Sequence, residues 1–492
     1  MTGFTRRQLM QGGALVALNA ALPDVADAAP RIVLNDASQL SPTPVFTHWI
    51  SRNGEQAKVI ERLRQELKSA AAAGRPVAVS AARHSMGGQS LPRDGTAITL
   101  DSLRVEPNTK EKTYLVDGGV RWQQVIAALD KIRFSPAVMQ SNNDFGIGAT
   151  FSVNAHGWPV PYGPFGSTVR SLRLMLADGT IVSCSRTEND ELFKLAMGGY
   201  GLVGIILDLE VDMVPNVALQ PTYEIMPGKA FAARFIDAVR NAPSTLMAYG
   251  RLNVSRNELF DEALLVTYRP TETPVEALPP AGAGGGMFSF LSREVYRAQT
   301  NSESIKRTRW FFETVVQPMS GSGIATRNTL INEPVSNLRS RDTSRTDILH
   351  EYFVPPARFG DFIDACKDII PTSVPEFLNV TLRYVGPDKD SVLAFAPEER
   401  IAAVMSFSQK FTPEAEAEMI RMTESLIDRV TAIGGTFYLP YRLHARRDQV
   451  TAAYPNVARF VERKRHYDPR LLFRNAMWQA YFANECAPQT CG

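Results

Sequence analysis

The first half of the chain alternates between helix-like and strand-like patterns of apolar residues. Apolar side chains recur at helical spacing within residues 53–73, at Val59, Ile60, Leu63 and Leu67. Further helices are predicted over residues 122–129 and 190–197. Short apolar runs bounded by turn residues predict strands over residues 76–80, 96–100, 113–116, 172–176, 181–183 and 205–211. This order predicts alternating α/β units.

The pattern changes after residue 215. Longer strand-like runs, such as residues 264–268 and 404–407, accompany helical patterns over residues 356–370 and 415–432. This combination is typical of an antiparallel sheet backed by helices. The chain as a whole is therefore predicted to be α+β.

Length and charge narrow the classes of function. A chain of 492 residues exceeds what one hydrophobic core usually supports, so two lobes are expected. Charged residues make up 21% of the chain and the net charge is +2, which gives no electrostatic basis for binding nucleic acid. Beyond the N-terminal segment no apolar run reaches membrane-spanning length, so no membrane span is expected.

The N-terminal segment resembles an export signal. Arg6 and Arg7 stand in a twin-arginine core, residues 12–22 are apolar, and small residues up to Ala28 provide a cleavage site. A basic amphipathic arm is the alternative interpretation. The order of the three parts favours a signal peptide over residues 1–28 and a linker over residues 29–45. The protein is then expected to be exported folded, with its cofactor bound, to the periplasm or beyond.

The four cysteines lack the spacing of a metal site: Cys184, Cys366, Cys486 and Cys491. Export permits disulfides, and Cys486 with Cys491 would close a small loop at the C-terminus. The pattern leaves open whether these two cysteines are paired.

The first candidate site is the loop that follows the predicted strand over residues 76–80. Small residues at Ser80, Ala81 and Ala82 let the backbone approach a ligand, and their amides suit a pyrophosphate. His84 would lie beside that ligand. A turn with a hydrogen-bonded histidine is the alternative interpretation.

Two glycine-rich stretches follow. Residues 141–166 combine glycine, asparagine and aromatic residues, as expected of a loop that wraps a planar ligand. Gly199, Gly201 and Gly204 match the dinucleotide pattern GxGxxG. They follow a helix and precede a strand, which is the reverse of the Rossmann order, so a Rossmann site is not expected.

Several motifs in order resemble one known family. His84-Ser85 with Gly88-Gln89, the segment 146–157 ending in His156-Gly157, the turn at Asp178-Gly179 and residues 199–204 resemble the FAD-binding domain of the vanillyl-alcohol oxidase / p-cresol methylhydroxylase (PCMH) family. The resemblance covers about residues 46–215. It implies a PCMH-type domain of two α/β subdomains, a substrate domain over residues 216–435, and a C-terminal segment over residues 436–492 that returns to the flavin domain.

The resemblance implies FAD as cofactor. In the family a histidine at the position of His84 often bonds covalently to the flavin, usually after a glycine, where this chain has Arg83. Covalent attachment therefore stays open, and a second bond through cysteine is not expected because residues 141–157 contain none. The implied cofactor-binding residues are Ser80, Ala81, Ala82, Arg83, His84, Ser85, Gln89, Gly118, Gly148, Ser152, Asn154, His156, Gly157, Gly204, Ile205 and Asn475.

The resemblance also suggests catalytic residues. Residues 379–385 are similar to a strand of aldonolactone and alditol oxidases that carries Glu-x-Arg; here Arg383 keeps the arginine and Thr381 replaces the glutamate. Tyr438, Arg442 and His444 lie in the stretch that resembles the family's C-terminal cap. We expect the arginines to stabilise charge or anchor substrate, and His444 or Tyr438 to act as base. A surface cation and an aromatic, basic turn are the alternatives.

The expected activity is hydride transfer from a CH–OH donor, such as a sugar, lactone or other alcohol, to FAD. The members nearest in resemblance are aldonolactone and alditol oxidases. Amine oxidation, as in cytokinin dehydrogenases, and a flavoprotein subunit that passes electrons to a periplasmic cytochrome remain alternatives. The electron acceptor is dioxygen or a periplasmic partner. Residues 274–291 are either a disordered surface loop or a functional segment, namely a mobile lid or a docking patch for a partner.

Overall fold

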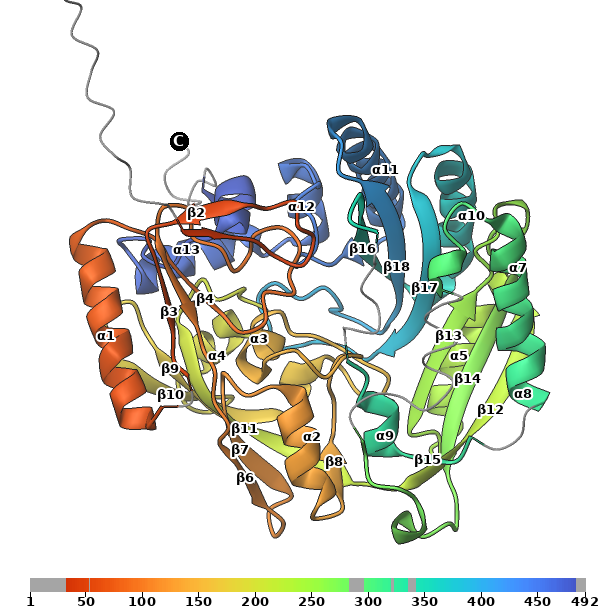
Figure 1. Ribbon diagram of the computed structural model, residues 1–492, viewed down its shortest axis with the longest axis horizontal. Coiled ribbons are helices and arrows are strands. Elements are labelled where there is room, and N and C mark those ends of the chain that lie inside the picture. Colours follow the sequence, from red (N-terminus) through yellow and green to blue (C-terminus); the bar gives the residue numbers. More distant parts are fainter. Residues whose placement is uncertain (1–31, 53, 283–295, 320–322, 335–341, 484–492) are drawn as a thin grey trace, which may run out of the picture. The chain divides into compact units, whose positions relative to one another are not determined.

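A computed structural model describes residues 32–52, 54–282, 296–319, 323–334 and 342–483 (Figure 1). The predicted signal peptide, Cys486, Cys491 and residues 283–291 of the predicted loop or lid lie outside the described residues. Within the described part, different regions of the chain build different kinds of sheet. The prediction of an α+β fold is confirmed.

The first sheet has three parallel strands in the order β3 (Thr47–Ile50), β5 (Thr96–Thr99) and β4 (Val77–Ser80). Helix α1 (Gln56–Ala72) packs on it through the apolar face that the sequence predicts, burying Leu63 and Leu67. The C-terminal segment joins this sheet, since the Val77 amide donates to the Leu472 carbonyl at 2.8 Å.

The second sheet has six strands, paired antiparallel. Its order is β10 (Ile181–Ser185), β9 (Val169–Met175), β11 (Ile205–Pro215), β7 (Thr113–Asp117) and β6 (Val105–Asn108), with β8 (Phe134–Pro136) paired to β11. Helices α2 (Trp122–Asp130), α3 (Ile147–Ser152) and α4 (Asp190–Ala196) accompany it. The stretch with Gly199, Gly201 and Gly204 runs from α4 into β11, in the order that the sequence indicates.

The third sheet is antiparallel and has eight strands. Its order is β15 (Ala325–Thr326), β12 (Ala218–Pro227), β14 (Glu262–Pro270), β13 (Met247–Leu252), β17 (Glu376–Val385), β18 (Arg400–Lys410), β16 (Arg345–Val354) and β19 (Thr436–Phe437). Helices α5 (Phe231–Arg240), α10 (Phe359–Ile369) and α11 (Pro413–Ala432) back it (Figure 1). The opposite face of its central strands β16, β17 and β18 lines the cavity described below.

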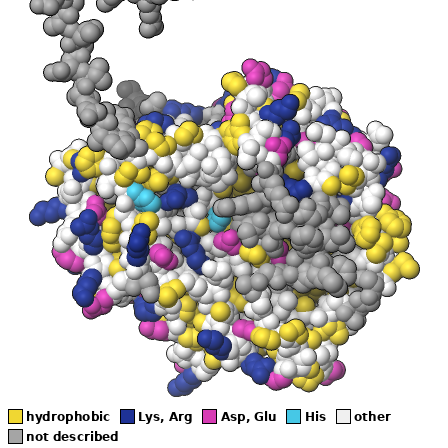
Figure 2. Space-filling model, viewed as in Figure 1, with side chains coloured by type: hydrophobic (Ala, Val, Ile, Leu, Met, Phe, Trp, Pro, Cys, Tyr) yellow, Lys and Arg dark blue, Asp and Glu magenta, His cyan; other side chains and the backbone are white. Residues whose placement is uncertain are grey.

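The other described helices are α7 (Glu303–Phe311), α8 (Gln317–Met319), α9 (Arg327–Ile331), α12 (Arg447–Ala453) and α13 (Val457–Tyr467). No helix in the described ranges is long and apolar enough to cross a membrane. Figure 2 shows basic and acidic side chains interspersed over the visible face, in keeping with a net charge of +2.

The short strands β1 (Ile32–Leu34) and β2 (Thr43–Val45) flank residues 35–41, which we call the N-terminal strap. Buried Asp36 accepts a hydrogen bond from the Gly88 amide at 2.8 Å, and the Ala37 amide donates to the Arg83 carbonyl at 3.1 Å. The Thr346 hydroxyl of β16 donates to the Ser38 carbonyl at 2.7 Å. The strap therefore connects the loop after β4 to the eight-stranded sheet.

Candidate active site

A cavity of about 550 Å³ lies where the three sheets approach one another. One wall consists of the loop after β4 and the residues around α3, and the other is the inner face of β16, β17 and β18. Segments that are far apart in the sequence thus share one space, which suits a ligand that is held at one end and reacts at the other.

The loop after β4 is held in an unusual conformation. The Ser80 hydroxyl donates to the Ile98 carbonyl of β5 at 3.1 Å and fixes the end of the strand. Arg83 has φ of +54°, a left-handed conformation that costs a non-glycine residue of order 1–3 kcal/mol. The imidazole of His84 lies against Phe145, with ring centroids 4.4 Å apart. Strain of this kind is kept where the surroundings enforce it, and here the strap does so.

Glycines let the second wall loop approach the first. A Cβ atom on Gly146 would lie 2.4 Å from the Ala81 Cβ, and one on Gly148 would lie 3.0 Å from the Gly118 carbonyl oxygen. Only glycine fits at Gly146 without displacing its neighbours. The cavity wall is consequently made of backbone at this end, with amides close to any bound group.

The other end of the cavity is a flat array of strand residues. In the sheet register Thr381 of β17 pairs with Val404 of β18, and Val404 pairs with Glu351 of β16. Side chains of directly paired residues point to the same face, so the Glu351 carboxyl lies in the same row as Thr381, two strands away. A buried carboxylate therefore enters the cavity from β16 rather than from the Thr381 position.

Glu351 is the centre of a buried polar network. Its Oε1 makes a short contact with His156 Nε2, and the Tyr441 hydroxyl donates to its Oε2 at 2.9 Å. Burial disfavours the charged form of Glu351, but His156, nearby Arg383 and the Tyr441 bond outweigh it and lower the pKa of Glu351. The carboxyl is thus ionised at neutral pH. Burial and the Glu351 charge raise the pKa of Tyr441 well above its ordinary value.

Arg383 supplies positive charge to the same end. Its Nη2 donates to the Ser141 hydroxyl in a short contact, and its Nη1 donates to the His156 carbonyl at 3.4 Å. Burial lowers the pKa of Arg383 from its ordinary value, while Glu351 acts in the opposite direction. An arginine remains charged under these conditions, so the cavity places one cation and one anion close together.

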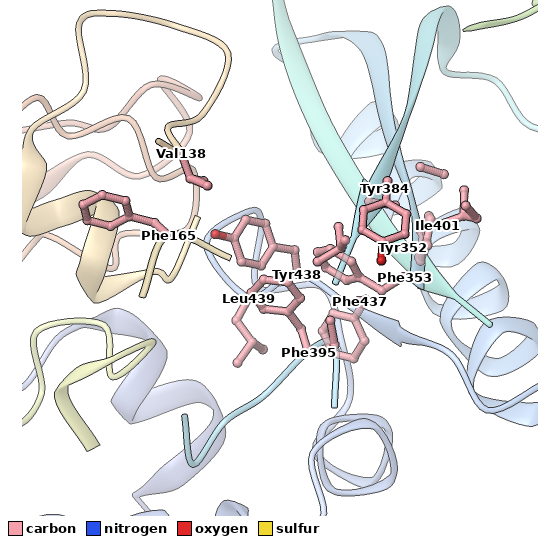
Figure 3. Packing of buried hydrophobic residues seen from close by; sticks show 14 of the residues in the cluster. Val138, Phe165, Tyr352, Phe353, Tyr384, Phe395, Ile401, Phe437, Tyr438 and Leu439 are labelled. Atoms are coloured by element: carbon pink, nitrogen blue, oxygen red, sulfur yellow. The ribbon is translucent and has the colours of Figure 1, made fainter. Parts of the chain in front are cut away.

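Tyr438 lies in the wall between the two ends. Figure 3 shows its ring among Phe353, Phe395 and Leu439, with the hydroxyl directed away from Phe353. The hydroxyl donates to the Val153 carbonyl at 2.7 Å. Because that hydrogen is already committed, Tyr438 serves packing and loop position in this arrangement.

Arg442 and His444 belong to a different cluster, behind the sheet. The Arg442 guanidinium pairs with Glu416 of α11 at 2.6 Å, and His444 Nε2 lies 2.9 Å from the same carboxylate oxygen. Burial opposes the charge of Glu416, but His444 and Arg442 lower its pKa to about 2. Neither side chain lines the cavity. The cluster instead ties α11 to the C-terminal segment.

Comparisons with known proteins agree with this arrangement. Residues 56–185 match the FAD_binding_4 family, the FAD binding domain, from the first residue of α1 to the last of β10. Residues 56–185 are an FAD-binding domain of the PCMH type, and proteins similar to the chain include aldonolactone oxidases and an alditol oxidase of the vanillyl-alcohol oxidase / PCMH family. FAD is the cofactor that this PCMH-type domain binds.

Individual relatives are similar over different shares of the chain. Cytokinin dehydrogenase 1 of Arabidopsis thaliana is 30% identical over 138 residues, 27% of this chain and 24% of that protein. L-gulonolactone oxidase of Bos taurus is 27% identical over 169 residues, 34% of this chain and 38% of that protein. Alditol oxidase of a Streptomyces species is 22% identical over 412 residues, 80% of this chain and 88% of that protein. The first two matches thus span less than two fifths of those relatives.

The residues of the PCMH-type cavity fit FAD. The small-residue loop and the close approach at Gly146 expose backbone to a diphosphate, and the same cavity is also lined by the polar residues of the sheet. Of the predicted cofactor residues, the cavity is lined by Ser80, Ala81, Ala82, Arg83, His84, Ser85, Gln89, Gly118, Gly148, Ser152, His156, Gly204 and Ile205.

Other predicted residues support the flavoprotein's wall from behind. Asn475 donates to the carbonyls of Gln89 and Tyr200 at 2.7 and 3.2 Å, and Asn154 donates to Asp388 at 2.9 Å. Gly157 packs against the Met139 carbonyl. Among the predicted catalytic residues, Arg383 and Tyr438 line the cavity, whereas Arg442 and His444 do not.

Sequence reasoning missed Glu351, Tyr441 and Ser141. Glu351 interrupts the apolar run of β16, and an acidic residue within a buried strand is a signal that could have identified it. Once Thr381 was found in place of the family's glutamate, a search for a compensating carboxylate elsewhere on the sheet would have pointed to the same residue.

Proposed function

We propose that this flavoprotein oxidises a carbon–hydroxyl group of a small polar molecule, such as a sugar, a lactone or another alcohol, to a carbonyl. The observation that supports this most strongly is the juxtaposition of Glu351, Tyr441 and Arg383 at one end of the cavity whose other end fits FAD. Oxidation of an alcohol needs a proton acceptor and a stabilised oxygen, and these residues offer both.

FAD held in this cavity would supply the hydride acceptor for the substrate carbon. The substrate hydroxyl must lose its proton as that hydride leaves, so that the C–O single bond becomes a carbonyl. Tyr441 can take this proton on its oxygen while passing its own hydrogen to Glu351 Oε2, to which it already donates at 2.9 Å. The proton comes to rest on Glu351.

Arg383 has a complementary role. Negative charge grows on the substrate oxygen as the proton departs, and a buried guanidinium stabilises such charge more strongly than an exposed one. The contact of Arg383 with Ser141 and the His156 carbonyl holds the guanidinium in place before substrate arrives. Short contacts around Glu351 orient the acceptor in the same way.

The same carboxylate gives a second candidate function some support. A substrate amine would be attracted to ionised Glu351, and a cytokinin dehydrogenase is among the relatives. Amine oxidation is therefore the alternative activity of this site.

Flavin reduction distinguishes the two activities. The purified protein is kept anaerobic and its visible flavin absorbance is followed while alcohols, aldoses, lactones and amines are added one at a time. Bleaching by a hydroxyl compound alone supports the proposed activity. Bleaching by amines alone replaces it with the alternative. A flavin that stays oxidised with every donor contradicts both.

Three further features belong to the proposal. Residues 1–28 direct export by the twin-arginine route, so that the enzyme works in the periplasm or outside the cell. His84, placed in the cavity wall, is a candidate for covalent attachment of the flavin. Dioxygen or a periplasmic electron carrier reoxidises the cofactor.

A further inference from the structure

Strand β17 presents two further polar side chains to the cavity beside Arg383. Asn379 and Thr381 alternate with buried apolar residues, so they share one face of the strand with Arg383, and both line the cavity. The proton transfer proposed above uses neither of them. Their hydrogen-bond partners determine what kind of substrate group they can bind.

The Thr381 hydroxyl accepts hydrogen bonds from the protein. Arg251 Nη1 donates to its oxygen at 3.2 Å, and Asn379 Nδ2 donates to the same oxygen at 3.4 Å. A hydroxyl oxygen has two lone pairs and one hydrogen, so these two bonds leave the hydrogen to be donated. No described residue accepts it. Thr381 therefore offers a hydrogen-bond donor to a group in the cavity.

The Asn379 amide is oriented in the same sense. Its Oδ1 accepts from Arg309 Nη2 at 3.2 Å, which turns the oxygen toward α7 and leaves the nitrogen beside Thr381. The nitrogen carries two hydrogens, of which Thr381 accepts one. The two side chains thus offer neighbouring donors, an arrangement that suits a group with two acceptor oxygens, such as a carboxylate.

The charged groups behind these two side chains are more positive than negative. Arg251 and Arg309 share one carboxylate, Glu313, at N–O distances of 3.0 and 2.8 Å. Burial opposes the charge of Glu313, but the two arginines outweigh it and lower its pKa. Two arginines and one glutamate leave one positive charge.

Two carboxylates line the cavity itself. Glu351 lies two strands away from Thr381 in the sheet and is engaged in its own polar network. Glu333 is not among the causes of the pKa shifts of Arg309 and Glu313. The positive charge beside Asn379 and Thr381 is therefore available to a bound anion.

We propose that the substrate is a hydroxy acid, such as a sugar acid, whose carboxylate is bound by the Thr381 hydroxyl and the Asn379 amide. Residues that follow one another on one face of a strand lie about 7 Å apart. A carboxylate at Thr381 is thus several bonds from a hydroxyl that is oxidised beside Arg383. The inference rests on the proposed oxidation of a carbon–hydroxyl group and narrows its substrate class.

Binding of a carboxylate that has no hydroxyl tests this subsite without any oxidation. Pentanoate and its neutral counterpart pentanamide are titrated into the FAD-loaded protein at pH 7 and followed by calorimetry. Pentanoate should bind at least about tenfold more tightly, because a hydrogen bond to a charged group is the stronger one. The difference should shrink as salt is added.

Thr381→Val keeps the shape of the side chain and removes the donor. It should weaken pentanoate binding about tenfold to a hundredfold, whereas Thr381→Ser should bind like the parent protein. Thr222→Val is the matched control, since it removes a strand hydroxyl that pairs with Thr267 outside the cavity. It should leave the affinity unchanged, and FAD content should be equal in all four proteins.

Anaerobic flavin reduction then tests the substrate class. D-gluconate and D-glucitol share a six-carbon polyol chain and differ at one end, where gluconate carries a carboxylate. Gluconate should half-saturate flavin reduction at about a tenth of the concentration that glucitol needs. Thr381→Val should remove most of this advantage.

The inference fails if pentanoate binds no more tightly than pentanamide, or if Thr381→Val binds pentanoate within twofold of the parent protein. Reduction of the flavin by glucitol but not by gluconate would also overturn it, while the proposed oxidation would stand. Preferential binding of pentanoate to a protein whose flavin no hydroxyl compound reduces would support the subsite and contradict the proposed oxidation.

Discussion

The role of Glu351 as proton acceptor can be tested by removing its charge with little change in the shape of the side chain. Glu351→Gln keeps the side-chain size but cannot take up the proton passed on by Tyr441. We expect the rate constant for anaerobic flavin reduction to fall about a hundredfold, near the lower end of what general base catalysis contributes. Stopped-flow absorbance measures this rate directly.

A matched control is Glu224→Gln, an exposed carboxylate of β12 outside the cavity that pairs with Arg234. It should reduce its flavin at the parent rate. FAD content should be equal in all three proteins, judged from the ratio of visible to ultraviolet absorbance. An unchanged reduction rate in Glu351→Gln would remove Glu351 from the proton path.

At the scale of elements, the N-terminal strap is predicted to keep the cofactor loop closed. Asp36→Asn removes the negative charge that accepts from the Gly88 amide and from Ser38, while the side chain keeps its size. Charge-assisted bonds are roughly twice as strong as neutral ones. We expect FAD to be released several-fold faster on dilution into guanidinium chloride, followed by flavin fluorescence.

If the flavin is covalently bound and cannot be released, the effect of Asp36→Asn is measured instead as faster proteolysis within the loop after β4. Asp94→Asn provides the comparison, since Asp94 is an exposed residue of a neighbouring turn. Equal behaviour of the two variants would show that the strap does not hold the loop.

Glu416 is one of the carboxylates that attach helix α11 to the C-terminal segment, beside Asp428, which pairs with Arg446. The pKa of Glu416 is lowered to about 2, well below that of an unfolded chain, so its ion pairs stabilise the native state above about pH 4.5 and this contribution disappears as the pH falls toward 2. Glu416→Gln should lower the midpoint of thermal unfolding at pH 7. The deficit should shrink steadily between pH 5 and pH 3.

When the partial exposure of Glu416 is taken into account, Glu416→Gln should lower the free energy of unfolding at pH 7 by about 2 kcal/mol. Glu414→Gln is the matched control. Glu414 lies two residues before Glu416 on the same helix and forms no ion pair with a described residue. A deficit that stays constant across this pH range would mean that Glu416 does not act through its charge.

Local sequence patterns predicted the helices and strands well. The positions of side chains that depend on contacts between residues far apart in the sequence could not be predicted in this way. The helical spacing in residues 53–73 and the small residues after Val79 act over a few positions, so both α1 and the cofactor loop could be recognised. Arg442 and His444 were assigned to the site by analogy, but Glu416, far away in sequence, draws them behind the sheet. Glu351 reaches the cavity only through the register of β16 with β18, which no local pattern contains.

At the scale of the whole molecule, the expected route of export can be tested. Replacing Arg6 and Arg7 by lysine should retain the protein in the cytoplasm, since the twin-arginine pathway reads both residues. Cell fractionation with an antibody, compared with a periplasmic marker carried by a different pathway, measures the shift. N-terminal sequencing of the exported form should begin near residue 29.

Retained protein should still contain FAD, because the export signal lies outside the FAD-binding domain at residues 56–185. Export of the lysine variant at the parent level would contradict the assigned route. Finding FAD only in the exported fraction would contradict loading before export.

The pairing of Val77 with Leu472 and Phe473 has a consequence for how the protein is made. The sheet that leads into the cofactor loop receives its last neighbour from residues close to the end of a 492-residue chain. A ribosome that has translated the whole FAD-binding domain has therefore not yet supplied a part of the sheet beside it. Nascent chains stalled before residue 472 should not capture FAD, so capture of the cofactor reports that translation has passed Phe473.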